Sequence, residues 1–277
     1  MIRESIGSFW RTTRELFTDR GSLAIFAGLY VLLLATLYGF IATREATVWQ
    51  ILLTLFFIAM APLIFFLLQA AIIGHARTGR IEWQRALHDS TKFALVALPV
   101  IFVGLGFMWL LNRWQRHFPA PHVNPAPLLS TPAAAPMHWP TVLFATLRAL
   151  IFGVFLPLAL IHLWIAVAGQ NLLAFVRGGR LFLRNLGQIL ALAFSPGSVL
   201  IYSLGLVIFG LIPYVLLFVR VPANGTWSEL TIFSVRLVLV FLFILLGWII
   251  TLSTFSKANQ IVVIKSPEPA VEETSNG

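Results

Sequence analysis

The stretch TVWQILLTLFFIAMAPLIFFLLQAAIIG, residues 47–74, contains no Asp, Glu, Lys or Arg and is followed directly by HARTGR, residues 75–80. A helix needs about 20 mainly apolar residues to cross the hydrocarbon layer of a bilayer. This run exceeds that length, and the arginines after it are typical of a helix that ends at a membrane surface. The apolar residues are continuous rather than alternating, so the pattern predicts a transmembrane helix and not a barrel strand.

The rest of the chain has the same character. Of its 277 residues 59% are hydrophobic and 10% are charged, and the mean hydropathy is +0.91. A soluble domain carries about 25% charged residues, so a soluble protein is excluded. We predict an all-α, polytopic bundle of six transmembrane helices with short interfacial helices, the spans covering about 22–42, 47–74, 93–112, 140–169, 198–219 and 229–255.

We expect residues 1–265 to form a single membrane domain. Prolines oppose regular structure in the outer loop 113–139, and the polar, acidic tail 266–277 is typical of disorder. Residues 1–20 are predicted to form an amphipathic helix on the inner surface, with Ile6, Phe9, Trp10 and Phe17 at the lipid boundary.

The cations predict the orientation. With the N-terminus inside, 13 cations lie on the inner side and four (Arg44, Arg113, Arg116 and Arg220) in the outer loops. The inner ones are Arg3, Arg11, Arg14, Arg20, Arg77, Arg80, Arg85, Lys92, Arg177, Arg180, Arg184, Lys257 and Lys265. The positive-inside rule then places both termini in the cytoplasm of a bacterial-type inner membrane. The net charge of +9 is explained by topology and by anionic lipid, so no nucleic-acid partner is expected.

Two predicted inner segments begin alike. Arg77-Thr78-Gly79-Arg80 follows the second span, and Arg177-Gly178-Gly179-Arg180, with Arg184 beyond it, follows the fourth. Each continues into a helical pattern, which predicts two interfacial elbows that bind inner-leaflet phospholipid or a protein partner. Two interpretations stay open: a duplicated unit of span, interfacial helix and span, or two ordinary positive-inside loops.

The six spans and the residues Arg77, Gly79, Arg80, Arg177, Gly179 and Arg180 resemble a group of six-span bacterial membrane proteins. The group includes the membrane domain of some glycerophosphodiester phosphodiesterases. The resemblance implies a membrane scaffold, and it transfers no catalytic residue because the soluble phosphodiesterase domain has no counterpart here.

Two arginines lie within predicted spans. Arg148 is about eight residues into the fourth span and Arg236 about seven into the sixth, so each is roughly 10–13 Å deep from the outer end. Unpaired intramembrane arginines usually face a bundle interior or an aqueous cavity. One hypothesis is that they hold an anion or a lipid phosphate together; the alternative is that they snorkel to outer phosphates or to Glu229.

Other candidate residues are polar or small. His162 is expected to join an inter-helix hydrogen-bond set with Gln69, Asn171, Gln170 or Ser203, and a proton relay is the alternative. Ala24, Gly28, Ala35 and Gly39 share one face of the first span and predict close helix packing, against another span or a second copy of the chain. His117, His122 and His138 match no metal-ligand spacing, so no metal or other cofactor is expected.

The sequence also favours one class of function over others. It contains no cysteine and no hydrolase, zinc-protease or phosphate-loop motif, and the predicted span cores hold no carboxylate. We therefore expect a non-enzymatic membrane protein that binds or helps move an anionic or amphipathic, lipid-like molecule, or that serves as the membrane subunit of a larger assembly. An independent small-solute transporter is the first alternative, and a membrane-embedded lipid-modifying enzyme is the second.

Overall fold

The fold is described by a computed structural model. It describes residues 2–43, 47–119, 138–168, 180–219 and 225–265, with the side chains of 2, 180–185 and 259–265 left aside. Several predicted features lie outside these residues: the outer loop expected beyond 119, Asn171, Arg177, Gly179 and the acidic tail 266–277. The described part of the chain is helical and contains no strand.

The helices follow one another along the chain as α1 (Ile2–Thr18), α2 (Arg20–Ala42), α3 (Val48–Thr78), α4 (Trp83–Gln115), α5 (Trp139–Leu150), η1 (Ile151–Phe155), α6 (Leu156–Val167), α8 (Arg180–Ala193), α9 (Pro196–Leu206), η2 (Val207–Leu211), α10 (Ile212–Phe218) and α11 (Thr226–Lys265). The segments α5, η1 and α6 form one continuous span, and α9, η2 and α10 form another. The elements η1 and η2 are single π-helical stretches.

Six helices are long and apolar enough to cross a membrane. They cover Arg20–Ala42, Val48–Thr78, Trp83–Gln115, Trp139–Val167, Pro196–Phe218 and Thr226–Ala258, and each contains most of one predicted span. The predicted all-α, six-span fold is therefore confirmed, and the chain is a multi-pass integral membrane protein. Its outward surface is apolar, as lipid contact requires: Phe102, Tyr38 and Trp49 are 69%, 74% and 80% exposed.

The third span differs from the prediction. An interfacial elbow was expected before a span at 93–112, but α4 runs without a break from Trp83 to Gln115. Neither Gly nor Pro occurs between Trp83 and Pro99, so nothing in the sequence ends a helix there. In the second elbow, Ser195 caps α9 and Pro196 occupies its first turn, so α8 stays a separate helix. The two segments that begin alike thus have different structures.

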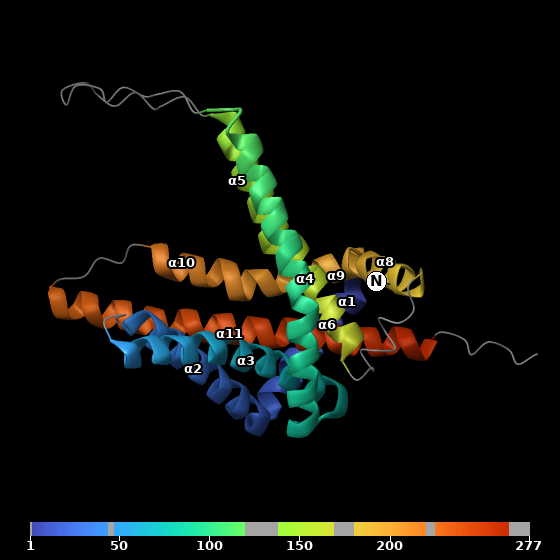
Figure 1. The fold of residues 1–277 in the computed structure, drawn as a ribbon. Helices are drawn as coiled ribbons and strands as arrows, with labels where there is room; N and C mark the ends of the chain where they lie inside the picture. Colours follow the sequence, from blue (N-terminus) through green and yellow to red (C-terminus); the bar gives the residue numbers. More distant parts are fainter. Residues whose placement is uncertain (1, 44–46, 120–137, 169–179, 220–224, 266–277) are drawn as a thin grey trace, which may run out of the picture.

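Three polar contacts gather the charged helix ends at one end of the molecule. Lys257 of α11 forms an ion pair with Glu15 of α1, and Asp19 accepts a hydrogen bond from His75 of α3 at 2.9 Å. Arg77 of α3 donates to carbonyls at the end of α6. We call this the basic end; it comprises α1, α8, the α3–α4 turn and the ends of α6 and α11. The opposite helix ends, which are the end of α2, the start of α3, the end of α4 and the starts of α5 and α11, are together called the far end; the end of α4 and the start of α5 lie apart from the start of α11 (Figure 1).

The helices fall into two groups (Figure 1). Helices α2, α3, α10 and α11 run alongside one another, with α2 packed on α3, and α11 packed on both α3 and α10. Helix α4 crosses them, and its second half leaves the group together with α5 (Figure 1). Helix α6 packs on both α4 and α11, so the two groups meet through α6 and the first half of α4.

The core lies toward the basic end, where these groups meet. Its largest fully buried side chains include Trp164 of α6, Phe93 of α4 and Phe255 of α11. The rings of Trp164 and Phe93 stack with centroids 5.8 Å apart, and the Trp164 indole donates to the Phe93 carbonyl at 3.3 Å. This contact fixes the first half of α4 against the end of α6.

Small residues permit close helix contacts, although mostly not those predicted. Ala24, Gly28 and Ala35 are exposed, and the prediction that they pack against another span is wrong for this chain. Only Gly39 lies in a close contact, because a Cβ there would come within 2.5 Å of the Phe57 ring. The buried face of α2 is instead formed by the larger residues Phe26, Leu33 and Thr36.

Two other glycines also lie at close contacts between helices. A Cβ on Gly205 of α9 would lie 1.9 Å from the Thr251 hydroxyl of α11. A Cβ on Gly247 of α11 would lie 2.7 Å from the backbone nitrogen of Phe209 in η2. Hence α9 and η2 rest directly on α11, as small residues allow within a membrane.

Each π-helical stretch ends two residues before a proline in the same span. Pro157 follows η1 and Pro213 follows η2. Proline has no N–H to donate to the carbonyl four residues earlier, and π-bulges accommodate such interruptions. For Pro157 that carbonyl belongs to Gly153, and the buried Tyr202 hydroxyl of α9 donates to it at 2.6 Å. The tyrosine therefore replaces the missing backbone donor and joins the fourth span to the fifth.

This replacement can be tested by substitution. We expect Tyr202→Phe to lower the free energy of unfolding by about 0.5–2 kcal/mol, the range for a hydrogen bond between membrane helices. The cost should shrink in a Pro157→Ala background, because alanine restores an N–H for Gly153. Unfolding in mixed micelles with increasing dodecyl sulfate measures both values.

The exposed Tyr214 of α10 supplies the control. Tyr214→Phe should leave the unfolding free energy unchanged. An equal cost of Tyr202→Phe with and without Pro157 would show that the hydroxyl does not stand in for the absent donor.

Candidate functional site

The candidate site is built at the basic end, around the turn between α3 and α4. Helix α3 ends at Gly79, whose φ of +71° is in the left-handed region and whose N–H donates to the His75 carbonyl. Glycine adopts this conformation without a Cβ penalty and commonly ends helices. The reversal places Arg77 in the last turn of α3 and Arg80 just beyond it, so the first predicted elbow supplies two differently placed cations.

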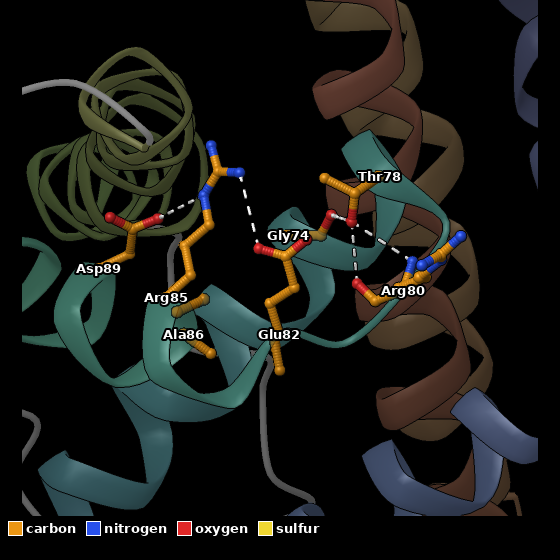
Figure 2. A pocket seen from close by; sticks show the side chains of 9 residues that line it. Gly74, Thr78, Arg80, Glu82, Arg85, Ala86 and Asp89 are labelled. Atoms are coloured by element: carbon orange, nitrogen blue, oxygen red, sulfur yellow. Dashed lines mark hydrogen bonds and ion pairs between the residues drawn. The ribbon is translucent and has the colours of Figure 1, made fainter.

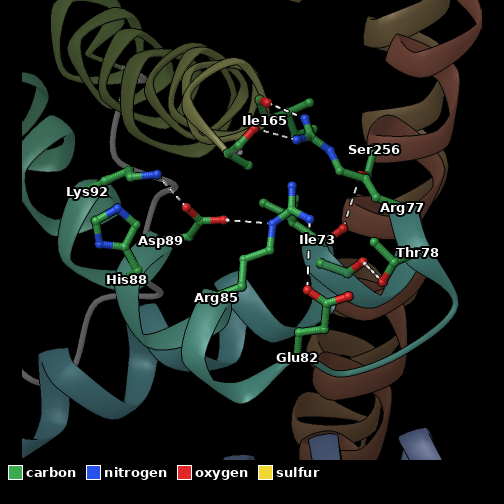
Figure 3. A network of polar contacts seen from close by, with 12 residues as sticks. Ile73, Arg77, Thr78, Glu82, Arg85, His88, Asp89, Lys92, Ile165 and Ser256 are labelled. Carbon is green, nitrogen blue, oxygen red and sulfur yellow. Dashed lines mark hydrogen bonds and ion pairs between the residues drawn. The ribbon is translucent and has the colours of Figure 1, made fainter. Parts of the chain in front are cut away.

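Arg77 is a structural cation. Its guanidinium donates to the carbonyls of Ala168, at 2.5 Å, and Ile165 in the last turn of α6 (Figure 3). The last four carbonyls of an α-helix lack a donor within the helix, and the negative end of the helix dipole favours a positive charge. Arg77 therefore closes the end of α6 and ties it to α3.

Buried charges occupy the first turns of α4. The Lys92 ammonium donates to the Asp89 carboxylate at 2.7 Å, and both residues are buried. Arg85 lies 4.0 Å from Asp89 and 4.0 Å from Glu82 (Figure 3). Glu82, Arg85 and Asp89 are spaced as in ion pairs on a helix surface. The continuous helix nevertheless carries Asp89 and Lys92 into the packed region beside α6, where a lone charge would be costly.

A small pocket opens beside this cluster, with room for roughly one water molecule. It is lined by Ala70, Ala71, Gly74, Thr78, Arg80, Glu82, Arg85, Ala86 and Asp89 (Figure 2). Arg80 is exposed, and its guanidinium has no hydrogen-bond or ion-pair partner within the described chain. The turn thus presents one unengaged guanidinium and a second, Arg85, that is only loosely paired.

Helix α1 forms a second part of the basic end. Phe9, Thr12 and Leu16 are buried on one face, against a core that includes α9 and α11. The prediction that Phe9 contacts lipid is therefore wrong: Phe9 faces the protein, because it lies on the same side as Leu16. The neighbouring face exposes Ile6, Trp10 and Phe17, of which Trp10 is 73% exposed.

The position of α1 is fixed by its C-terminal junction. Asp19 caps α2, and hydrogen bonds from Ser22 and His75 lower the pKa of the Asp19 carboxyl to about 2. Asp19 is therefore ionised at neutral pH and holds the start of α2 against the end of α3.

The structure does not bring the two intramembrane arginines together. Arg148 of α5 donates to Asn112 and Gln115 of α4, at 2.6 and 2.5 Å. Arg236 of α11 donates to the Val219 carbonyl, at 2.7 Å, just after α10 ends. Because α5 and α10 point in different directions (Figure 1), the hypothesis of one shared anion site is not supported. The prediction missed Asn112 and Gln115, although polar residues three apart near a span end were visible in the sequence.

His162 and Gln69 belong to different contacts. The buried His162 ring shares hydrogen bonds with the Leu158 carbonyl at 2.9 Å and the Ser198 hydroxyl at 3.1 Å. Gln69 instead accepts from the Trp248 indole at 2.6 Å. The predicted single set is therefore wrong: Ser198 of α9 is the histidine's partner, and Asn171 lies outside the described residues. A helix-wheel pattern does not say which neighbouring helix a polar side chain meets.

The remaining predicted residues lie on α8 or beyond the described chain. Arg180 and Arg184 are in the first turns of α8, next to the undescribed Arg177 and Gly179. Within the described residues, no group of three or more His, Asp or Glu side chains is placed to hold a metal ion.

Comparisons with known proteins yield no relative: no family matches this chain, and neither a curated protein nor a solved structure is similar to it.

The contrast between Arg77 and Arg80 gives a prediction. Arg77→Leu should lower the unfolding free energy by about 2–4 kcal/mol, because it leaves helix-end carbonyls without a donor in a partly buried position. Arg80→Leu, three residues away, should change it by less than about 0.5 kcal/mol. Both values come from dodecyl sulfate unfolding of the full chain, and equal effects of the two substitutions would contradict the capping role.

Proposed function

We propose that this integral membrane protein is a non-enzymatic protein that binds an anionic, lipid-like molecule at its basic end. In this proposal the basic end faces the cytoplasm across a bacterial-type inner membrane. The carrying observation is the exposed face of α1, where Ile6, Trp10 and Phe17 form an apolar stripe outside the packed bundle. Their helical positions place Arg3 and Arg14 along one edge of that stripe.

This arrangement suits the boundary between lipid chains and head groups. An interfacial helix buries its apolar stripe in the acyl boundary and keeps its cations among the phosphates. Arg80 and Arg85 add two guanidinium groups at the same end, beside the half-exposed Trp83. Each cation near an anionic leaflet contributes about 1 kcal/mol of attraction, so this end favours anionic over zwitterionic lipid.

The orientation can be tested because the chain contains no cysteine. Thr18 and Thr226 are exposed at the basic and far ends, respectively. In intact bacterial cells, a membrane-impermeant maleimide should label Thr226→Cys, and it should label Thr18→Cys only after permeabilisation. The reverse pattern would place the basic end outside and remove the cytoplasmic assignment.

Lipid preference is tested by native mass spectrometry of the purified full chain with phosphatidylglycerol and phosphatidylcholine in mixed micelles. We expect the parent to retain phosphatidylglycerol preferentially, and Arg14→Gln combined with Arg80→Gln to weaken that retention by roughly tenfold or more. The matched control is Arg11→Gln, because Arg11 shares its face of α1 with Glu4 and Glu15. Equal retention by the parent and the double variant, or an equal loss in the control, would refute the proposal.

A further inference from the structure

A second polar site lies at the far end, between the last turns of α4 and the fourth span. We propose that Arg148, Asn112 and Gln115 form a binding site for a phosphate group. The inference extends the proposed lipid-binding function to the other half of the membrane, and it uses none of the residues of the basic end.

The hydrogen bonds orient the three side chains as a unit. One guanidinium nitrogen of Arg148, Nη2, donates to both the Asn112 Oδ1 and the Gln115 Oε1 atoms. Asn112 and Gln115 are three residues apart and so share one face of α4. Because each amide turns its oxygen toward the arginine, each NH₂ group points elsewhere as a donor.

The site retains more donors than acceptors. The two N–H bonds of Arg148 Nη1 and the two amide NH₂ groups take no part in the contacts above, and Arg148 Nε is buried without any hydrogen-bond partner in the described chain. A buried donor without an acceptor costs free energy that a bound acceptor recovers. The missing component of this cluster is therefore an acceptor, and the positive charge specifies an anion.

No carboxylate of the neighbouring chain fills that role. The sequence contains no Asp or Glu between Asp89 and Glu229, a range that includes all of α5 and the far half of α4. Arg113 and Arg116 add positive charge to the same end of α4. The surroundings therefore favour an anion supplied from outside the chain.

The depth of the site matches a head-group phosphate. In a helix the Cα–Cβ bond tilts toward the N-terminus, so Arg148 extends toward the start of α5 and the membrane surface. Trp109, Trp114 and Trp139 are exposed at this end, at 62%, 55% and 71%, as in the aromatic belt at a membrane interface. Asn112 is itself exposed, so the donors are open to the lipid side of α4.

Arg236 differs from Arg148 in the kind of partner that its guanidinium has. Its guanidinium donates to the Val219 backbone carbonyl at 2.7 Å, a partner that the fold supplies. Arg236 therefore provides a matched control: a second arginine in the far half of a span, with a backbone acceptor in place of two amides.

The test uses the full chain carrying Arg14→Gln and Arg80→Gln, so that binding at the basic end does not obscure the far end. Native mass spectrometry with phosphatidylglycerol should show one retained lipid, and adding Arg148→Gln should weaken its retention roughly 10–100-fold, as expected for charge-assisted hydrogen bonds. Asn112→Leu with Gln115→Leu should weaken it as well, and Arg236→Gln should match the background. Arg148→Lys keeps the positive charge but loses the planar guanidinium, so its lipid retention should lie between those of the background and Arg148→Gln. If Arg148→Gln fails to fold, Arg148→Lys takes its place in the test.

A lipid phosphate and free phosphate share this chemistry, and a second arm separates them. Inorganic phosphate is titrated into the protein in a neutral detergent. If phosphate binds, and Arg148→Gln weakens its binding as it weakens lipid retention, the site is a free-anion site. Lipid retention that is insensitive to inorganic phosphate identifies the head group. The proposed site is refuted if retention of phosphatidylglycerol and phosphate equals that of the background in three variants: Arg148→Lys, Asn112→Leu with Gln115→Leu, and Arg236→Gln. This conclusion does not depend on the result at the basic end.

Discussion

The fold depends on the requirement that backbone polar groups be satisfied within the protein wherever lipid replaces water. Helices meet this requirement in their interiors, but prolines and helix ends leave carbonyls free. In this protein side chains from neighbouring helices take up several of them. Tyr202 donates to the Gly153 carbonyl, Arg77 to the end of α6, and Arg236 to the residue just after α10.

These contacts also explain how a loosely gathered set of helices keeps its arrangement. Lipid tails are as apolar as leucine, so the hydrophobic effect does not hold membrane helices together. Close approach at Gly205 and Gly247 and hydrogen bonds to freed carbonyls supply specific attachments instead. The attachment points lie mainly between consecutive spans or on α11, which contacts α1, α3, α6, α9 and α10.

The sequence was sufficient for the features that depend on the chain's own local composition. Long apolar runs such as 47–74 located the six spans, because hydrophobic length is read along one helix. The sequence did not predict contacts between side chains on different helices. His162 meets Ser198, and the small face of Ala24 and Gly28 is left exposed while Gly247 makes the close contact. The elbow before α4 failed for a local reason, since no residue between Trp83 and Pro99 ends a helix.

The candidate sites divide in the same way. Arg77, Arg80 and Arg148 stood out as cations beside or inside spans, but their roles depend on partners that the sequence did not identify. Carbonyls of α6 make Arg77 structural, whereas the Arg80 guanidinium has no partner in the described chain and Arg148 holds two amides. The distinction between a cation that supports the fold and one available to a ligand is therefore a property of the tertiary structure.

Helix α4 carries Arg85, Asp89 and Lys92 in its early turns and Asn112 and Gln115 in its last. At 1.5 Å per residue, its 33 residues extend roughly 50 Å, so one uninterrupted rod passes from one leaflet to the other. In the described chain its far half packs along the fourth span: Gly104 lies against Phe152 of η1 and Leu156 of α6, and the last turns lie beside α5. A change of tilt at one end of α4 would therefore move the amide pair at the other end, because both belong to the same helix.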